Sequence, residues 1–286
     1  MSAALVLFFT PATTAAGRDH LVSVLAEHGL AAIHEDDVAA PTKWTAHFVD
    51  GASRDAAAAA VLRHAEFQAL KIEHTEIEDE DWARRTQADL PAIRIGRIIV
   101  APPWDVPPEA PGTTVVIIEP SRGFGTGHHQ STRLALGLLQ DRDVAGKTMI
   151  DVGTGSGVLA IAAARLGAHS VIAIDVDPDA IDNARENVER NGVAGTVGVR
   201  VEDLSQTSLE PVDVVTANLT GSLLTRYARE LTRLVRPGGV LITAGFTVEE
   251  SERVKEAFAP AMAVVDSVEE EGWGGLAVTQ NYELRT

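Results

Sequence analysis

The sequence contains no cysteine, and this absence removes several kinds of chemistry at once. A chain without thiols forms no disulfides, has no thiolate nucleophile and offers no cysteine ligands to zinc. Disulfides are typical of oxidising compartments, so a chain that cannot form them is compatible with the cytoplasm. We therefore expect a cytoplasmic protein whose function rests on other side chains.

Positive charge is scarce as well. The chain carries 24 Lys and Arg against 41 Asp and Glu, which gives a formal net charge of -17. A field of this sign repels nucleic-acid phosphates and attracts basic partners. An acidic surface that serves only solubility would give the same composition. We expect a basic protein partner and no direct binding of nucleic acid.

Long apolar runs are also absent. No stretch of about 18 uninterrupted apolar residues occurs, so the sequence predicts no membrane-spanning helix. The apolar start, Met1–Phe9, lacks the basic region and cleavage site of a signal peptide and is typical of a buried strand. We expect a monomer without membrane contacts.

Apolar periodicity predicts a small α+β domain over residues 1–77. The predicted elements follow the order β-α-β-β-α-β, which is typical of a ferredoxin-like fold. The strands are Ala4–Phe9, Leu30–His34, Trp44–Val49 and Ala69–Ile77, and the helices are Arg18–His28 and Ser53–Ala65, with Ser53 as the cap of the second helix.

Residues 78–92 are expected to link this domain to a second one. The acidic run Glu76–Asp81 leads into Trp82, and Asp81–Ala88 is predicted to form a short helix. Acidic residues also favour the positive end of a helix dipole, which is a purely structural explanation for the run.

Residues 93–286 are predicted to form an α/β domain. Two β-rich runs, Ile93–Ala101 and Thr113–Ile118, are expected to pair as a hairpin where the domain begins. Strands then alternate with helices, a pattern that favours a parallel sheet wrapped by helices. The expected strands are Thr148–Asp151, Val171–Asp175, Val197–Val201, Val212–Ala217 and Val240–Ala244, the helices include Gly157–Leu166, Pro178–Asn191 and Leu223–Val235, and Ala261–Val268 with Gly274–Tyr282 forms an antiparallel edge hairpin.

A glycine-rich loop carries the strongest functional signal. The segment Asp151-Val-Gly-Thr-Gly-Ser-Gly157 follows a strand and opens a helix, where glycines allow a tight turn and the helix start offers free N–H groups. A dinucleotide fingerprint would require a third glycine at the position of Val158. The spacing therefore favours a nucleoside ligand without a pyrophosphate, although a plain structural turn is the alternative.

Three polar positions follow successive strands. Asp175 ends its strand where a carboxylate accepts hydrogen bonds from ribose hydroxyls, whereas Asp177 before Pro178 suits a helix cap. Asp203, next to Glu202, is placed to reach an adenine amine, or else simply faces solvent. Asn218 lies where a transferred group is expected and has the donors and the acceptor to orient an amine. Capping the next helix is the alternative role for Asn218.

The adjacent histidines His128 and His129 suggest either a metal site or base catalysis. No carboxylate or third ligand lies at a metal-like spacing, so we predict no metal and expect these residues to start a helix or cover a cofactor. Ser156 belongs to the glycine loop and not to a nucleophile elbow, because Thr154 precedes the Gly-Ser-Gly triplet.

Together these motifs resemble the ribosomal protein L-eleven methyltransferase family, PrmA. The resemblance rests on Gly123-Phe-Gly-Thr-Gly-His-His-Gln-Ser-Thr132, the glycine loop, Asp175-Val-Asp-Pro178 and Ala217-Asn-Leu219, and it includes Glu80-Asp-Trp82 and the pair Pro103-Trp104. It departs from the family in the linker, which usually carries more than one tryptophan. This departure bears on the substrate more than on the chemistry.

The resemblance implies a ferredoxin-like substrate-recognition domain joined to a Rossmann-like, seven-stranded methyltransferase domain. It implies methylation, to the trimethyl state, of lysine side chains and the N-terminal amine of one large-subunit ribosomal protein, with S-adenosylmethionine as the cofactor. The family's cofactor positions fall on Thr132, Gly153, Asp175 and Asn218, and the loop around Thr126 and His128 is implied to fold over the cofactor.

We therefore predict an S-adenosylmethionine-dependent protein N-methyltransferase in which Asn218 is catalytic. The predicted cofactor-binding residues are Thr126, His128, Thr132, Gly153, Gly155, Asp175, Asp203 and Asn218. A lysine with an ordinary pKa near 10.4 is protonated at neutral pH, and a desolvated site beside a sulfonium lowers that pKa without a dedicated base. The alternatives are a methyltransferase for lysines of another protein or for a small molecule, an NAD-dependent oxidoreductase and a non-catalytic binding module.

Overall fold

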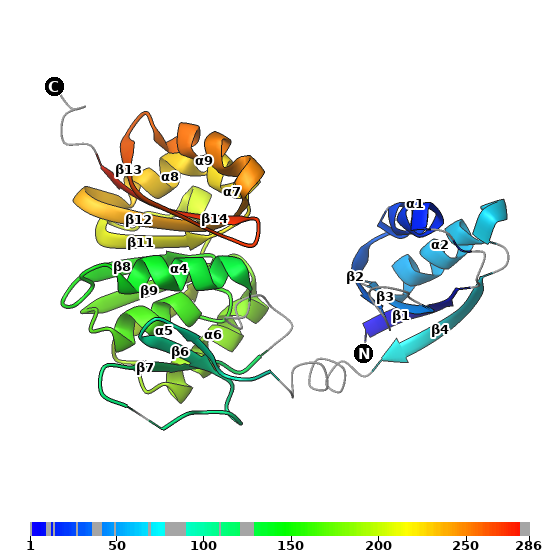
Figure 1. Cartoon of the computed structure of the whole chain (residues 1–286), viewed down its shortest axis with the longest axis horizontal. Coiled ribbons are helices and arrows are strands. Elements are labelled where there is room, and N and C mark those ends of the chain that lie inside the picture. Colours follow the sequence, from blue (N-terminus) through cyan, green and yellow to red (C-terminus); the bar gives the residue numbers. More distant parts are fainter. Residues whose placement is uncertain are drawn as a thin grey trace. The chain divides into compact units, whose positions relative to one another are not determined.

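A computed structural model describes residues 2–9, 13, 15–26, 28–35, 42–48, 50–67, 70–77, 90–108, 110–120 and 129–280. The chain forms two compact units, Met1–Asp89 and Leu90–Thr286, which are blue to cyan and green to red in Figure 1. The predicted linker helix Asp81–Ala88 and Trp82 lie outside the described residues. In the described part of the chain, no helix is long and apolar enough to cross a membrane.

The first unit has the predicted order of elements. Its elements are β1 (Ser2–Phe8), α1 (Ala15–Ala26), β2 (Leu30–Glu35), β3 (Lys43–Phe48), α2 (Gly51–Val61), the short 3-10 helix η1 (Ala65–Phe67) and β4 (Lys71–Ile77). The strands form a sheet in the order β2-β3-β1-β4, and every neighbouring pair is antiparallel. Alternate side chains of β1 and β3, such as Leu5 and Trp44, meet Leu21 and Leu25 of α1 in one buried core. This arrangement confirms the ferredoxin-like pattern.

The start of α2 differs from the prediction. Asp50, not Ser53, caps this helix, because the Asp50 carboxylate accepts a hydrogen bond from the backbone N–H of Ser53 at 2.7 Å. Ser53 is already inside the first turn, where its own N–H needs an acceptor. The α-helix also ends at Val61, earlier than predicted, and Ala65–Phe67 forms a separate 3-10 turn.

The second unit begins with a three-stranded sheet, and here the hairpin prediction is wrong. The sheet contains β5 (Ile93–Ile95), β6 (Ile98–Ala101) and β7 (Thr114–Ile117). The hairpin lies inside the first β-rich run, because Gly96 has a φ of 55° and permits a two-residue turn between β5 and β6. The second run, β7, pairs with β6 in parallel.

The main sheet has seven strands in the order β10-β9-β8-β11-β12-β14-β13. Its strands are β8 (Thr148–Val152), β9 (Ser170–Asp175), β10 (Val197–Val201), β11 (Val212–Asn218), β12 (Val235–Thr247), β13 (Met262–Glu270) and β14 (Trp273–Gln280). The first five are parallel, and β14 pairs antiparallel with both β12 and β13. The edge hairpin is therefore confirmed, and its turn at Glu271 and Gly272 has φ values of 48° and 82°, as a type I′ turn requires.

Helices cover both faces of this sheet, as Figure 1 shows. Helices α4 (Gln130–Gln140), α5 (Val158–Arg165) and α6 (Pro178–Arg190) pack on one face. Helices α7 (Gly221–Arg226), α8 (Ala228–Arg233) and α9 (Ser251–Phe258) pack on the other. The sequence predicted α7 and α8 as one helix, but Tyr227 interrupts it with a φ of -103° and a ψ of 17°. From β8 the chain adds β9 and β10 on one side of the sheet and then β11 and β12 on the other, so the carboxyl ends of the parallel neighbours β8 and β11 are the expected place for a ligand.

Candidate functional site

The glycine loop lies between β8 and α5 at this switch point. Gly153, Gly155 and Gly157 have φ values of 68°, 53° and 83°, which L-residues rarely adopt. The N–H groups of Gly153 and Thr154 both donate to the Ile174 carbonyl of β9, at 2.9 and 3.0 Å. Because Gly157 caps α5 without a side chain, the start of this helix presents its N–H groups toward the loop.

Gly153 is required for a second reason. A Cβ on this residue would lie 2.4 Å from Cδ2 of Leu219, the residue that follows β11. The missing side chain therefore lets the loop and the end of β11 come into close contact. The left-handed backbone disfavours a larger residue here, and an added side chain would also force the Leu219 side chain to move.

The carboxylate of Asp175 closes the other side of the loop. Its Oδ2 accepts the Gly155 N–H at 3.0 Å, and its Oδ1 accepts the Asp177 N–H at 3.1 Å. Asp177 caps α6 by accepting the Asp179 N–H at 3.0 Å, which confirms its predicted structural role. Each Asp175 oxygen retains a lone pair that can accept a further hydrogen bond from a ligand.

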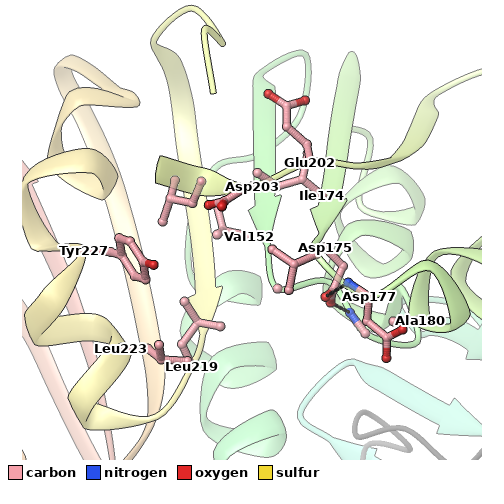
Figure 2. Close-up of a pocket in the computed structure, with 14 residues that line it drawn as sticks. Val152, Ile174, Asp175, Asp177, Ala180, Glu202, Asp203, Leu219, Leu223 and Tyr227 are labelled. Carbon is pink, nitrogen blue, oxygen red and sulfur yellow. Dashed lines mark hydrogen bonds between the residues drawn. The ribbon is translucent and has the colours of Figure 1, made fainter. Parts of the chain in front are cut away.

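A cavity of about 410 Å³ opens beside the loop, a size within the usual range for small-molecule sites. Figure 2 shows Leu223 and Tyr227 on one side of it, and Asp175 and Asp177 on the other. The cavity is lined by Val152, Gly153, Gly155, Ile174, Asp175, Val176, Asp177, Ala180, Glu202, Asp203, Leu204, Leu219, Leu223 and Tyr227. The structure thus brings together four of the predicted cofactor residues, namely the two glycines, Asp175 and Asp203.

Asp203 stands at the carboxyl end of β10 and caps the 3-10 helix η2 (Leu204–Gln206). Its Oδ1 accepts the Ser205 N–H at 2.8 Å, and this hydrogen bond holds the pKa of the Asp203 carboxyl below its ordinary value. The neighbouring Glu202 also lines the cavity, while its carboxylate accepts the Thr207 hydroxyl and pairs with Arg200 at 3.2 Å. The rim of the cavity near β10 is therefore negatively charged.

Asn218 and Thr132 form a pair next to the cavity but not among its lining residues. The Asn218 Nδ2 donates to the Thr132 hydroxyl oxygen at 3.2 Å, and Thr132 is buried in the first turn of α4. The alternative role for Asn218 is wrong, because Thr220 is the N-cap of α7. Gly245 of β12 lies directly against the end of β11. A Cβ on Gly245 would lie 2.5 Å from the Leu219 carbonyl oxygen and 3.0 Å from Asn218 Oδ1.

His129 caps α4, which confirms a helix-start role for this member of the histidine pair. The Ser131 N–H donates to its Nδ1 at 3.3 Å, and its ring meets Trp273 edge-on at a centroid distance of 4.6 Å. Burial, and secondarily the Arg133 cation, lower the pKa of His129 below its ordinary value. Thr126 and His128 lie outside the described residues. Within the residues that are described, no three His, Asp or Glu side chains are arranged to hold a metal.

Sequence reasoning missed two contributions to the site. Tyr227 and Leu223 are four residues apart, a spacing that puts them on one helical face, but an apolar face of this kind is indistinguishable from core in the sequence. Asp151 was noted only as an acidic residue before the loop. It is fully buried, and it accepts the hydroxyls of Thr154 and Thr216 at 2.6 Å each.

Comparisons with known proteins identify one family of relatives. The family model for ribosomal protein L11 methyltransferase (PrmA) matches residues 12–281. A protein named ribosomal protein L11 methyltransferase from Cupriavidus pinatubonensis is 41% identical over 199 residues, which cover 69% of this chain and 65% of the relative. A protein of the same name from Photobacterium profundum is 39% identical, over 73% of this chain and 70% of the relative.

The chain therefore aligns with just under two thirds of the length of the Cupriavidus relative. Among solved structures, a ribosomal protein L11 methylase from Lactobacillus delbrueckii subsp. bulgaricus matches with a TM-score of 0.60 and 27% identity. That match covers 68% of this chain and all of the solved chain.

Proposed function

We propose that this chain, which belongs to the ribosomal protein L11 methyltransferase (PrmA) family, transfers methyl groups from S-adenosylmethionine to lysine side-chain and N-terminal amines of ribosomal protein L11. The observation that carries the proposal is the cavity at the β8–β11 switch point, where Gly153, Gly155, Asp175 and Asp203 meet. The names of the relatives supply the substrate, which stays a proposal for this chain.

The residues around the cavity fit a nucleoside cofactor. The glycine loop leaves no side chain between the ligand and its backbone. We expect Asp175, which has a lone pair left on each oxygen, to accept from ribose hydroxyls, and Asp203 to accept from an adenine amine. S-adenosylmethionine, when bound, supplies an electrophilic methyl group on a sulfonium. Thr132, Thr126 and His128 remain cofactor contacts by family resemblance alone.

Asn218 is proposed to orient the target amine. Its Nδ2 is committed to Thr132, so its carbonyl Oδ1 is the atom left to accept an amine N–H. An amine held in this way keeps its lone pair directed away from the amide. Catalysis then rests mainly on orientation and on a desolvated site that lowers the amine pKa, and it needs no dedicated base.

The role of Asn218 is tested by separating turnover from cofactor affinity. We expect Asn218→Ala to lower kcat by roughly tenfold to a hundredfold, because the amine loses its positioning group. The cofactor Kd, measured by calorimetry, should change much less. Unchanged turnover would remove Asn218 from the reaction.

The same proposal covers the protein substrate and the role of each unit. Residues 1–77 are proposed to recognise the substrate, residues 78–92 to link the two domains, and residues 93–286 to bind the cofactor and catalyse. A chain with a net charge of -17 suits a lysine-rich ribosomal protein. Such a substrate places the reaction in the cytoplasm, where we expect the enzyme to act as a monomer. A lysine on a different basic protein is the alternative target.

Cofactor choice separates a methyltransferase from an oxidoreductase. S-adenosylmethionine should raise the melting temperature of the full chain, since a ligand that binds only the folded state stabilises it. NAD should not, because Val158 occupies the position of the third dinucleotide glycine. A shift with NAD alone would favour the oxidoreductase.

A further inference from the structure

Asp151 is a buried charged group that the proposed reaction does not use. It lies in β8, two residues before the glycine loop, and its exposed fraction is 0%. It is absent from the cavity lining, so it has no direct access to a ligand there. A buried carboxylate is costly unless it is fully hydrogen-bonded, and an apolar residue would cost less. Its presence at this point therefore calls for a role.

The two oxygens of Asp151 join two different parts of the site. Oδ2 accepts the hydroxyl of Thr154 in the glycine loop at 2.6 Å, and Oδ1 accepts the hydroxyl of Thr216 in β11 at 2.6 Å. Both threonines are buried. Asp151 and Thr216 are direct neighbours in the parallel register of β8 and β11. The carboxylate thus bridges the cofactor loop and the adjacent strand.

Thr216 connects this bridge to Asn218. The two residues are separated by one position in β11, so their side chains point to the same face of the sheet. On that face Asn218 binds Thr132 of α4. Polar contacts therefore connect the glycine loop to the strand that carries Asn218. They lie beneath α4 and α5, within an otherwise apolar core.

We propose that Asp151 is a positioning residue, which holds the glycine loop and strand β11 in register through Thr154 and Thr216 and so sets Asn218 relative to the cofactor. This inference rests on the proposed methyl transfer. It assigns no contact with substrate to Asp151 itself. The hydroxyls of Thr154 and Thr216 are the groups through which it acts.

Ionisation of Asp151 is part of this role. Burial raises the pKa of its carboxyl to about 6. The hydrogen bonds from Thr154 and Thr216 act in the opposite direction, and the Asp175 charge raises the pKa a little further. Protonation turns one oxygen into a donor, so it can no longer accept both hydroxyls on equal terms. We therefore expect the register of loop and strand to be kept above about pH 6 and weakened below it.

Few other charged groups lie on the elements that pack against Asp151. Asp175 faces it from β9. The sole charged residue of α5 is Arg165, in its last turn. The sole charged residue of β11 is Asp213, which lies at the opposite end of the strand and accepts the Thr148 N–H. The sole charged residue of α4 is Arg133, which forms an ion pair with Glu270 at 2.8 Å. The pKa of His129, the cap of α4, is lowered by burial and by the Arg133 cation, so this residue needs its own control.

Matched threonine variants of the full chain test the bridge. Thr154→Val and Thr216→Val keep the shape and remove the hydroxyl, whereas Thr154→Ser and Thr216→Ser keep the hydroxyl. We expect each valine variant to lower kcat for methyl transfer to the basic protein by about tenfold, as loss of a positioning contact does, and each serine variant to retain most of it. Thr243→Val is the control, since this hydroxyl of β12 is buried without a hydrogen-bond partner in the described structure.

The pH profile separates positioning from mere stability. The wild-type kcat should fall below about pH 6. That fall should be steeper than in Asp151→Asn, in which only protonation of the target amine remains, and it should keep its wild-type steepness in His129→Asn. Valine variants with wild-type kcat, or an acid limb that is equally steep in Asp151→Asn, would overturn the inference. Failure of the wild-type chain to bind S-adenosylmethionine in calorimetry would instead overturn the proposed function.

Discussion

At the residue scale, the site depends on what glycine permits. Gly153 combines a left-handed backbone with contact against Leu219, and Gly245 brings β12 against the end of β11. The sequence located this loop, Asp175 and Asp177, because glycine spacing and strand ends are local signals. It did not reveal the bridge at Asp151, since its partner Thr216 is 65 residues away and meets it only in the folded sheet.

Gly153 provides a prediction with a matched control. Gly153→Ala should weaken cofactor binding and destabilise the fold, because a φ of 68° is strained for alanine and the new Cβ, 2.4 Å from Leu219 Cδ2, would force the Leu219 side chain to move. Gly192 has the same φ but nothing within 4 Å of an added Cβ. Gly192→Ala should therefore show only the backbone cost, about 1–2 kcal/mol in the free energy of unfolding, with the cofactor Kd unchanged. Denaturant unfolding and calorimetry on both variants measure the difference.

Equal effects of the two alanine substitutions would contradict the packing explanation. They would mean that backbone strain alone, and not the contact between the loop and Leu219, accounts for the glycine at position 153. Intact cofactor binding in Gly153→Ala would also contradict its place in the site.

At the element scale, the start of α4 is fixed from several sides. Arg133 pairs with Glu270 at 2.8 Å, and Gln130 donates to Glu271 at 2.6 Å, so the helix is joined to the β13–β14 hairpin. His129 packs on Trp273 at the same place. Since Thr132 in this first turn holds Asn218, the hairpin contributes to the order of the site although it lies at the edge of the sheet.

Some elements could be predicted and others could not, for physical reasons. The alternation of strands and helices identified the parallel sheet, because its period is local. The parallel pairing of β6 and β7 was missed because pairing direction depends on how the chain returns between them. The break at Tyr227 left no signal in the apolar spacing of α7 and α8.

The cap of α4 makes a pH-dependent prediction. In the folded protein the pKa of His129 is lowered from 6.5, so the unfolded chain binds the proton more tightly. The stability that the neutral cap contributes is therefore present above about pH 6.5 and is lost as the pH falls below it. His129→Ala should cost about 0.5–1 kcal/mol at pH 7.5, and less at pH values below 6.5.

His129→Asn is the comparison for this prediction, because asparagine caps helices well and also lacks the ring contact with Trp273. The difference between the alanine and asparagine variants then isolates the cap. A difference near zero at neutral pH would show that a side-chain cap at position 129 contributes nothing to the stability of α4.

At the scale of the whole molecule, the two units have separate hydrophobic cores. Leu5, Trp44 and Phe67 belong to the core of the first unit, and, among the residues that the structure describes, this core shares no member with the two core clusters of the second. The cavity is built wholly from residues of the second unit. Separate cores are what independently folding domains require.

This separation predicts how the two units divide the function. A protein of residues 90–286 should melt cooperatively and keep the cofactor Kd of the full chain, since it contains the whole cavity. It should lose transfer to the ribosomal protein if the first unit recognises that substrate. Calorimetry and a transfer assay on the same preparation measure both. Full activity without residues 1–89 would contradict a recognition role for the first unit.

The central claim is tested most directly by transfer of labelled methyl groups from S-adenosylmethionine to purified ribosomal proteins, followed by mass spectrometry of each labelled protein. Our account predicts label on ribosomal protein L11, on lysine side chains and on the N-terminal amine, and a rate of labelling roughly tenfold to a hundredfold lower with the Asn218→Ala variant at matched enzyme concentration. Label on another basic protein would keep the methyltransferase and change its substrate. A chain that binds S-adenosylmethionine but labels no protein, or that does not bind it, would contradict the account.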